Sequence, residues 1–275
     1  MKKIFYSAGV ITFIGALSLG ATGAFFSDSE TSTGNTFTAG AIDLKVDSEQ
    51  HYNGNVCQLV GTEVKTYQWV GQSDYPVPGT PCDGTWTLTD LGPTNHFFNF
   101  GDVKPGDQGE NTVSLHIDNN PAWACIDLKT TSNEENTIIE PEASAGDVTN
   151  GVGEGELAGN INFQAWLDDG ATDGFQGTST DVTEGDNIWQ VGEPAMASGS
   201  LSSLNSTTTL VLADSTTGTP LPPTVTDYVG LFWCAGTVTG GAGNLGCDGS
   251  TMGNTAQTDS VTADATFRVE QHRNN

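Results

Sequence analysis

Hydrophobic residues alternate with polar ones along much of the chain after residue 40, as expected for β-strands that turn one face to a core. Clusters of Gly, Pro and Asp separate these runs, and no long helical periodicity follows residue 24. This pattern predicts an all-β fold, an antiparallel jelly roll or β-sandwich with long loop insertions. The clearest alternating runs are Ile42/Leu44/Val46, Val113/Leu115/Ile117, Ile126/Leu128, Ile161/Phe163/Ala165/Leu167, Leu210/Leu212 and Val261/Ala263/Ala265/Phe267/Val269.

The first 24 residues follow a different pattern. Two lysines precede an apolar run from Ile4 to Leu19, and small residues follow as far as Ala24. A run of about 16 apolar residues is shorter than the roughly 20 that a membrane-spanning helix needs. We therefore expect residues 1–24 to be a signal peptide, cleaved between Ala24 and Phe25. The alternative is an uncleaved leader, which would be the chain's only contact with a membrane.

The rest of the chain divides by composition. Residues 25–40 are mostly polar and precede the first alternating run, and residues 41–275 carry all the later strand signals. We expect the second range to be one β-sandwich domain, with an insertion rich in Gly, Pro and Tyr at residues 50–85. Pro105 and Gly106 suit the two central positions of a tight turn. The acidic, Gly-rich stretch 133–159 predicts a solvated loop.

Acidic residues dominate the charge. The chain has 34 Asp and Glu against 8 Lys and Arg, a formal net charge of −26. Such a chain is not expected to bind nucleic acid, which requires basic residues to neutralise phosphate. Cations are natural partners, and the segment that begins Asp168-Asp-Gly offers hard oxygen ligands on a flexible loop. We expect Asp168, Asp169 and Asp173 to be calcium ligands, or else part of a solvated acidic turn. No cofactor is otherwise required.

Five cysteines follow the leader, and export would allow disulfides to form. The simplest pairing joins Cys57 to Cys82 and Cys234 to Cys247, each across a local loop, and leaves Cys125 unpaired. The alternative pairs Cys125 with Cys234 across the core, because each closely follows a Trp in a strand-like segment. Spacing alone does not choose between these pairings.

The sequence carries no catalytic signature. Its four histidines form no His-Glu-x-x-His arrangement, and no Gly-x-Ser-x-Gly elbow occurs. We therefore expect a protein that is not an enzyme.

Four segments resemble the TasA and camelysin family of secreted bacterial matrix proteins, which a dedicated signal peptidase usually called SipW releases. The longest is Phe26 to Asp47, which is similar to the family's mature N-terminus. The others are the leader end Gly-Ala-Thr-Gly-Ala, the turn Val103 to Asp107, and the closing stretch Gln257 to Gln271. The cysteine-containing loops and the acidic middle depart from the family pattern.

The resemblance implies a jelly-roll subunit of extracellular biofilm-matrix fibres. In such fibres each subunit donates an N-terminal strand to the next, and here the donor residues would be Phe25, Phe26, Thr36 and Phe37. The expected partner is the chain itself, in a homopolymer at the cell surface or in the matrix, with other matrix proteins or polysaccharide as further partners. Camelysin has been classed as a metalloprotease, but the sequence offers no zinc arrangement for that activity.

Two alternatives remain open at this stage. The N-terminal segment could pair within its own sheet as an ordinary first strand. The protein could also be a monomeric secreted adhesin or carbohydrate-binding β-sandwich module, with aromatic residues in and around the insertion either forming a binding platform or filling a small core beneath the loop. Those aromatic residues are Tyr52, Tyr67, Trp69, Tyr75 and Trp86.

Overall fold

The computed structural model describes residues 42–170, 181–223 and 225–272, and all of them belong to one compact unit, Gly40–Asn275. Several sequence predictions fall outside these residues. They are the cleavage site at Ala24 and Phe25, the donor residues Phe25, Phe26, Thr36 and Phe37, and the calcium ligand Asp173.

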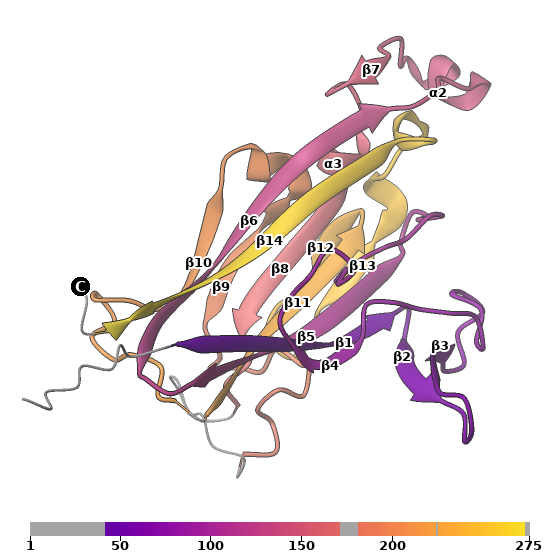
Figure 1. Ribbon diagram of the computed structural model, residues 1–275. Helices are drawn as coiled ribbons and strands as arrows, with labels where there is room; N and C mark the ends of the chain where they lie inside the picture. Colours follow the sequence, from indigo (N-terminus) through magenta and orange to yellow (C-terminus); the bar gives the residue numbers. More distant parts are fainter. Residues whose placement is uncertain (1–41, 171–180, 224, 273–275) are drawn as a thin grey trace, which may run out of the picture. The chain divides into compact units, whose positions relative to one another are not determined.

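The described chain is built from antiparallel sheets (Figure 1). The larger sheet has the order β3-β2-β1-β5-β11-β8-β9, with β4 also paired to β1. Its strands are β1 (Asp43–Tyr52), β2 (Asn55–Val60), β3 (Thr66–Val70), β4 (Trp86–Thr89), β5 (Gln108–Asp118), β8 (Ile161–Leu167), β9 (Ala195–Ser200) and β11 (Thr226–Ala235).

The smaller sheet has the order β10-β6-β14, with β7 also paired to β6. Its strands are β6 (Ala122–Glu135), β7 (Gly151–Val152), β10 (Thr208–Ala213) and β14 (Ser260–Gln271). The remaining elements are short: the paired strands β12 (Thr237–Thr239) and β13 (Gly246–Asp248), the helices α2 (Glu140–Ala145) and α3 (Leu157–Asn160), and the 3-10 turns η1 (Leu201–Asn205), η2 (Gly249–Thr251) and η3 (Asn254–Ala256). None of the helices in the described ranges is long and apolar enough to cross a membrane.

The two sheets share one hydrophobic core. Val46 and Leu115 of the larger sheet belong to the same buried cluster as Ile126 and Leu210 of the smaller sheet. The prediction of an all-β, antiparallel sandwich is therefore confirmed. β5, which pairs with β1 and β11, departs from simple alternation, because the consecutive residues from Asn111 to Leu115 are all buried.

A second core lies under the insertion. Tyr52 and Trp69 are only 1% and 5% exposed, and Tyr52 packs its ring against Trp69, Tyr75, Phe100 and Trp233. The insertion itself forms the hairpin β2–β3, which extends the larger sheet beyond β1. The aromatic residues therefore fill a core beneath the insertion, and Tyr52 and Trp69 do not form an exposed platform.

A polar layer explains why β1 continues past the predicted start of the insertion at residue 50. Ser48 and Gln50 are buried and follow Val46 on the same face of β1. The amide of Asn111 donates to the hydroxyl of Ser48 (2.9 Å), and Gln50 donates to the carbonyl of Phe97 (2.6 Å). These bonds give both side-chain NH2 groups an acceptor, although Gln50 Oε1 and Asn111 Oδ1 have no partner among the described residues, and the strand runs on to Tyr52 while its sequence pattern turns polar.

The predicted turn at Pro105 and Gly106 is present. The N–H of Asp107 donates to the carbonyl of Lys104 (2.9 Å), and Gly106 has a φ of +88°. A positive φ at the second central position favours glycine there. The carboxylate of Asp107 accepts from the hydroxyl of Tyr52 (2.8 Å), so the turn is fastened to the second core.

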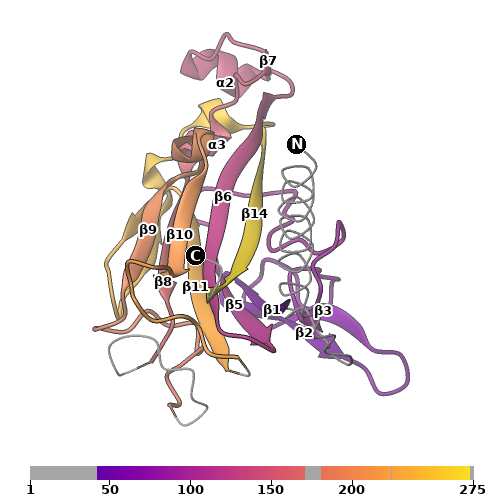
Figure 2. The same cartoon turned by 60° about the vertical axis from the view of Figure 1, so that its left-hand side comes forward.

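The β6–β14 pair is the long ladder of the smaller sheet (Figure 2). Ser260 pairs with Glu134 at one end, and Gln271 pairs with Ala122 at the other. The register shifts between Thr262 and Ala263, where β6 carries one extra residue. This β-bulge divides the ladder into a short and a long part.

Candidate functional site: an open sheet edge and a buried carboxylate cluster

The edge of β14 is the first candidate site. Within the described residues β14 pairs only with β6, so its other edge offers backbone N–H and C=O groups to a further strand. Ala265, Phe267 and Val269 alternate along β14 and pack against the main core while remaining partly exposed. This core-facing row is therefore less completely covered than the equivalent row on β5.

The opposite side of this opening is formed by the start of β1. Ile42 and Leu44 are also partly buried against the main core. Phe97, from the connection before β5, packs its ring 5.7 Å from that of Phe267 and 4.9 Å from that of Trp86. The apolar rim around the open edge thus comes from three separate segments, which local spacing in the sequence does not reveal.

The four disulfide-bonded cysteines belong to other clusters than the main core, whereas Cys125 of β6 pairs with Arg268 of β14. Cys57 is joined to Cys82 beside the second core, and Cys234 is joined to Cys247. Cys125 is the free cysteine, on β6, so Cys234 has the local partner and not the one across the core. The two disulfides indicate a protein that folds in an oxidising environment, as extracellular and secreted proteins do.

The described residues on either side of the gap at 171–180, in the loop proposed for calcium, are held by carboxylates of the same loop. Asp168 accepts from the N–H groups of Gly185 (3.2 Å) and Asn187 (3.0 Å), one on each oxygen. Glu193 likewise accepts from the N–H groups of Gly170 (3.0 Å) and Gln190 (2.7 Å). Burial raises the pKa of Asp168 to about 6 and that of Glu193 to about 8. Calcium binding at Asp168 and Asp169 stays a prediction.

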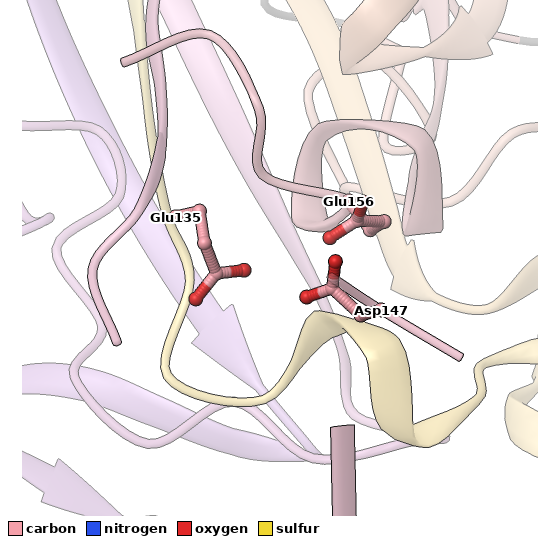
Figure 3. A group of neighbouring side chains, drawn as sticks. All are labelled: Glu135, Asp147 and Glu156. Carbon is pink, nitrogen blue, oxygen red and sulfur yellow. The ribbon is translucent and has the colours of Figure 1, made fainter. Parts of the chain in front are cut away.

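A second group of carboxylates is more sharply organised. We call it the Glu135 cluster: Glu135, Glu142, Asp147, Glu156 and Asp259. Carboxylate oxygens of Glu135, Asp147 and Glu156 lie within 4.8 Å of one another, and so do those of Glu135, Glu142 and Asp259. Figure 3 shows the first three side chains pointing toward one another. Glu135 belongs to both groups and is therefore the centre of the cluster.

Local structure brings the members together from distant parts of the chain. Glu135 ends β6, and Asp259 immediately precedes β14, where the two strands begin to pair. Glu142 lies in α2, which ends at Gly146 with a φ of +101° and so directs the following Asp147 back toward β6. Glu156 precedes α3.

In each of four of these residues, one carboxylate oxygen accepts hydrogen bonds from nearby N–H or hydroxyl groups. The N–H of Thr137 donates to Glu135 Oε1 (3.1 Å), and the N–H of Ile139 donates to Glu142 Oε2 (2.7 Å). Thr149 donates its N–H and its hydroxyl to Asp147 Oδ1, both at 3.0 Å. Asp259 Oδ2 accepts from the N–H groups of Glu156 (2.6 Å) and Leu157 (3.0 Å).

The remaining oxygens have no such partners. Glu135, Glu142 and Asp147 are 3%, 0% and 6% exposed, and Glu156 and Asp259 are half-buried. In each of the five residues one solvent-inaccessible oxygen receives no hydrogen bond from an N–H or hydroxyl group of the described residues: Glu135 Oε2, Glu142 Oε1, Asp147 Oδ2, Glu156 Oε2 and Asp259 Oδ1. Buried polar atoms are normally paired, so this concentration of unpaired acceptors requires an explanation.

The electrostatics of the cluster are unfavourable to negative charge. Burial, followed by a side-chain hydrogen bond with Asp259 and the charge of Asp259, raises the pKa of Glu135. Burial and the nearby Asp147 and Asp259 raise the pKa of Glu156. No ion pair formed by the residues of the described ranges involves any of the five carboxylates. Their charge is therefore balanced by something other than Lys, Arg or His of these ranges.

The prediction that residues 133–159 form a solvated loop is wrong for three of the acidic residues in this stretch. Glu135, Glu142 and Asp147 are buried, because α2 folds back over the end of β6 and Asp259 arrives from a distant segment. The spacing of the acidic residues carries no recognisable motif, and only the density of carboxylates between two strand signals could have drawn attention to the stretch.

The geometry of the two sites is the available guide to function, since neither protein-family models nor curated proteins match the chain.

Proposed function

We propose that the protein is a secreted structural subunit of extracellular fibres, and that it assembles when residues 25–40 of one copy pair with the open edge of β14 in another. The observation that carries this proposal is the edge itself: a 12-residue strand whose outer edge is unpaired among the described residues and whose core-facing side chains are partly exposed. Natural proteins usually blunt or cover such an edge, because it recruits further strands.

An added strand would gain two kinds of contact. Its backbone would form hydrogen bonds with β14, and its inward side chains would complete the core. The donor segment carries Phe25, Phe26 and Phe37, which are large apolar side chains of the kind that the rim of Leu44, Phe97 and Phe267 can accept. Cleavage after Ala24 would free this segment, so export and assembly would be coupled.

The alternative of a monomeric adhesin or carbohydrate-binding module has less support. It depended on exposed aromatic residues, and two of its central members, Tyr52 and Trp69, are buried in the second core. Biofilm-matrix location follows from the fibre proposal and not from the disulfides, which support only an oxidising environment.

The test compares two purified forms by negative-stain electron microscopy, one beginning at Phe25 and one at Thr38. We expect fibres from the first and dispersed particles from the second. A synthetic peptide of residues 25–40 should then bind the form that begins at Thr38. The matched control peptide replaces Phe26 and Phe37 by Ser, which keeps length and charge but removes apolar contacts, and should bind at least about tenfold more weakly.

Each other result has a defined meaning. Monomers from both forms, with no binding of the peptide, would overturn the proposal. Monomers from the Phe25 form that unfold at a higher temperature than the Thr38 form would show that the segment pairs within its own sheet, and this too would overturn donated-strand assembly.

A further inference from the structure

We propose that the Glu135 cluster binds calcium and so fastens the first residues of β14 to the end of β6. The cluster combines three carboxylate residues that are more than nine-tenths buried with five unpartnered oxygens, and its members form two groups of three carboxylates that share Glu135. The inference is independent of the proposed fibre function, because it concerns the stability of the sandwich and not its edge.

Charge balance is the first argument for a cation. A buried carboxylate without a counter-charge is costly, and the cost rises when several share one site. Among the described residues no Lys, Arg or His forms an ion pair with the cluster, so protons or a cation are the balancing charges that we expect. A divalent cation would neutralise two charges at once and would also coordinate the unpartnered oxygens.

The hydrogen bonds around the cluster favour a preformed site. One oxygen each of Glu135, Glu142, Asp147 and Asp259 is fixed by backbone N–H groups, so the other oxygen is aimed without the loss of much side-chain freedom on binding. In Asp168 and Glu193, by contrast, backbone N–H groups donate to both carboxylate oxygens, so neither oxygen is left without a partner.

The ligand chemistry selects calcium among common metals. All five candidate ligands are carboxylate oxygens, whereas zinc and other softer metals prefer His and Cys. Calcium accepts six to eight oxygens at about 2.3–2.6 Å in irregular geometry, so two oxygens on opposite sides of one ion are about 5 Å apart. The spacing of up to 4.8 Å within each group fits that span. Magnesium requires shorter bonds and near-ideal octahedral geometry, and it usually retains several waters.

The ligands join segments that the chain separates widely. Glu135 ends β6, Glu142 and Asp147 belong to α2 and its exit, and Asp259 leads into β14. The ion would thus close the start of the β6–β14 ladder, where Ser260 pairs with Glu134. Removing it should loosen this end and leave repulsion between the carboxylates.

The experiment measures calcium binding by isothermal titration calorimetry and thermal unfolding in EDTA and in CaCl2, with the form that begins at Phe25. We expect the unfolding temperature to rise by about 5–10 °C at a calcium concentration 100-fold above the Kd. The double variant Glu142→Gln/Asp147→Asn should lose this shift. In EDTA it should be at least as stable as the unaltered chain, because two repelling charges have been removed.

Three single variants complete the test. Asp264→Asn removes an exposed charge from β14 and should keep the full calcium shift. Asp169→Asn alters the other acidic loop and should also keep it. Glu156→Gln changes a half-buried ligand, so it should fold even if the double variant does not, and should weaken calcium binding at least about tenfold.

The proposal is overturned by any of three results. The unaltered chain could show no calcium response, which would leave protons as the balancing charges. Glu156→Gln could bind calcium as tightly as the unaltered chain. Asp169→Asn could abolish the response while the Glu135 cluster variants retain it, which would place the calcium site in the other loop.

Discussion

Two acidic regions of this protein use the same side chains in opposite ways. In the Asp168 loop, residues 168–193, Asp168 and Glu193 each give both oxygens to backbone N–H groups. In the Glu135 cluster, four carboxylates each give one oxygen to the chain and leave the other unpartnered in the interior. Composition is similar in the two regions, so the difference lies in how the surrounding backbone amides are distributed.

This difference distinguishes a carboxylate that stabilises a loop from one that is positioned to bind a ligand. A fully satisfied carboxylate replaces missing backbone partners and stabilises the loop by itself. A half-satisfied one has fixed geometry and uncompensated charge, which are the properties of a preorganised cation ligand. The variants below are expected to affect the two regions in different ways.

The largest expected effect is a pH dependence beside the Asp168 loop. Asp227 is 2% exposed, its oxygens have no hydrogen-bond partner among the described residues, and burial, with a smaller effect from Glu184, raises its pKa to about 8. The folded state therefore holds a proton that the unfolded state releases above pH 4. Stability should fall as pH rises from about 4 to 8, by roughly 2–5 kcal/mol from this residue.

Urea denaturation at pH 5 and pH 8 checks this expectation. Asp227→Asn should reduce the decline between the two values, since Asn does not ionise, and should leave the part of the decline that Asp168 and Glu193 cause. The same variant should leave the calcium response of the Glu135 cluster unchanged. A decline of equal steepness in the variant would show that other groups cause it.

The architecture could largely be predicted from the sequence, because alternation at positions such as Leu115 and Phe267 reports directly which face meets the core. The ends of strands are harder to predict from the sequence. β1 extends through buried Ser48 and Gln50, whose hydrogen-bond partners are far away in sequence. Residues 97–100 carry three Phe side chains but form an irregular connection, and their rings pack in both cores.

The candidate sites are harder still to predict, because they depend on contacts between residues that are far apart in the sequence. Glu135 and Asp259 become neighbours only when β6 and β14 pair, and no local spacing records that pairing. Tyr52 and Trp69 were candidates for a surface platform because the insertion around them is rich in turn residues, yet hairpin formation buries them.

An intermediate effect should come from a glycine beside the Glu135 cluster. A Cβ at Gly155 would lie 2.8 Å from the carbonyl oxygen of Glu134, so Gly155→Ala must displace the backbone next to Glu156. We expect a loss of about 1–3 kcal/mol in the free energy of unfolding and weaker calcium binding. Gly159→Ala is the control, because nothing lies within 4 Å of its added Cβ.

These two variants are compared by urea denaturation and calorimetry. A Gly159→Ala protein should be within about 0.5 kcal/mol of the unaltered chain. Equal effects of the two substitutions on calcium binding would contradict the assigned position of Glu156.

The smallest expected effect comes from a comparison of two turns that have the same hydrogen bonds. Thr149 donates its N–H and hydroxyl to Asp147 Oδ1, and Thr183 donates the same groups to Asp181 Oδ1. Replacing either Thr by Val removes one hydrogen bond and should cost about 1 kcal/mol. Calorimetry should show weaker calcium binding only for Thr149→Val, since only Asp147 belongs to the cluster. A similar loss in Thr183→Val would implicate the Asp168 loop.

The bulge between Thr262 and Ala263 has a consequence for the length of any strand that joins β14. Beyond the bulge the ladder runs without interruption from Ala263 to Gln271, a distance of about 30 Å in an extended chain. The extra residue lies in β6, so a strand added to the other edge of β14 meets only the local change in twist at this point. We therefore expect an incoming segment to pair most regularly with the residues from Ala263 to Gln271, about nine residues, and the rest of the segment to span the distance between subunits.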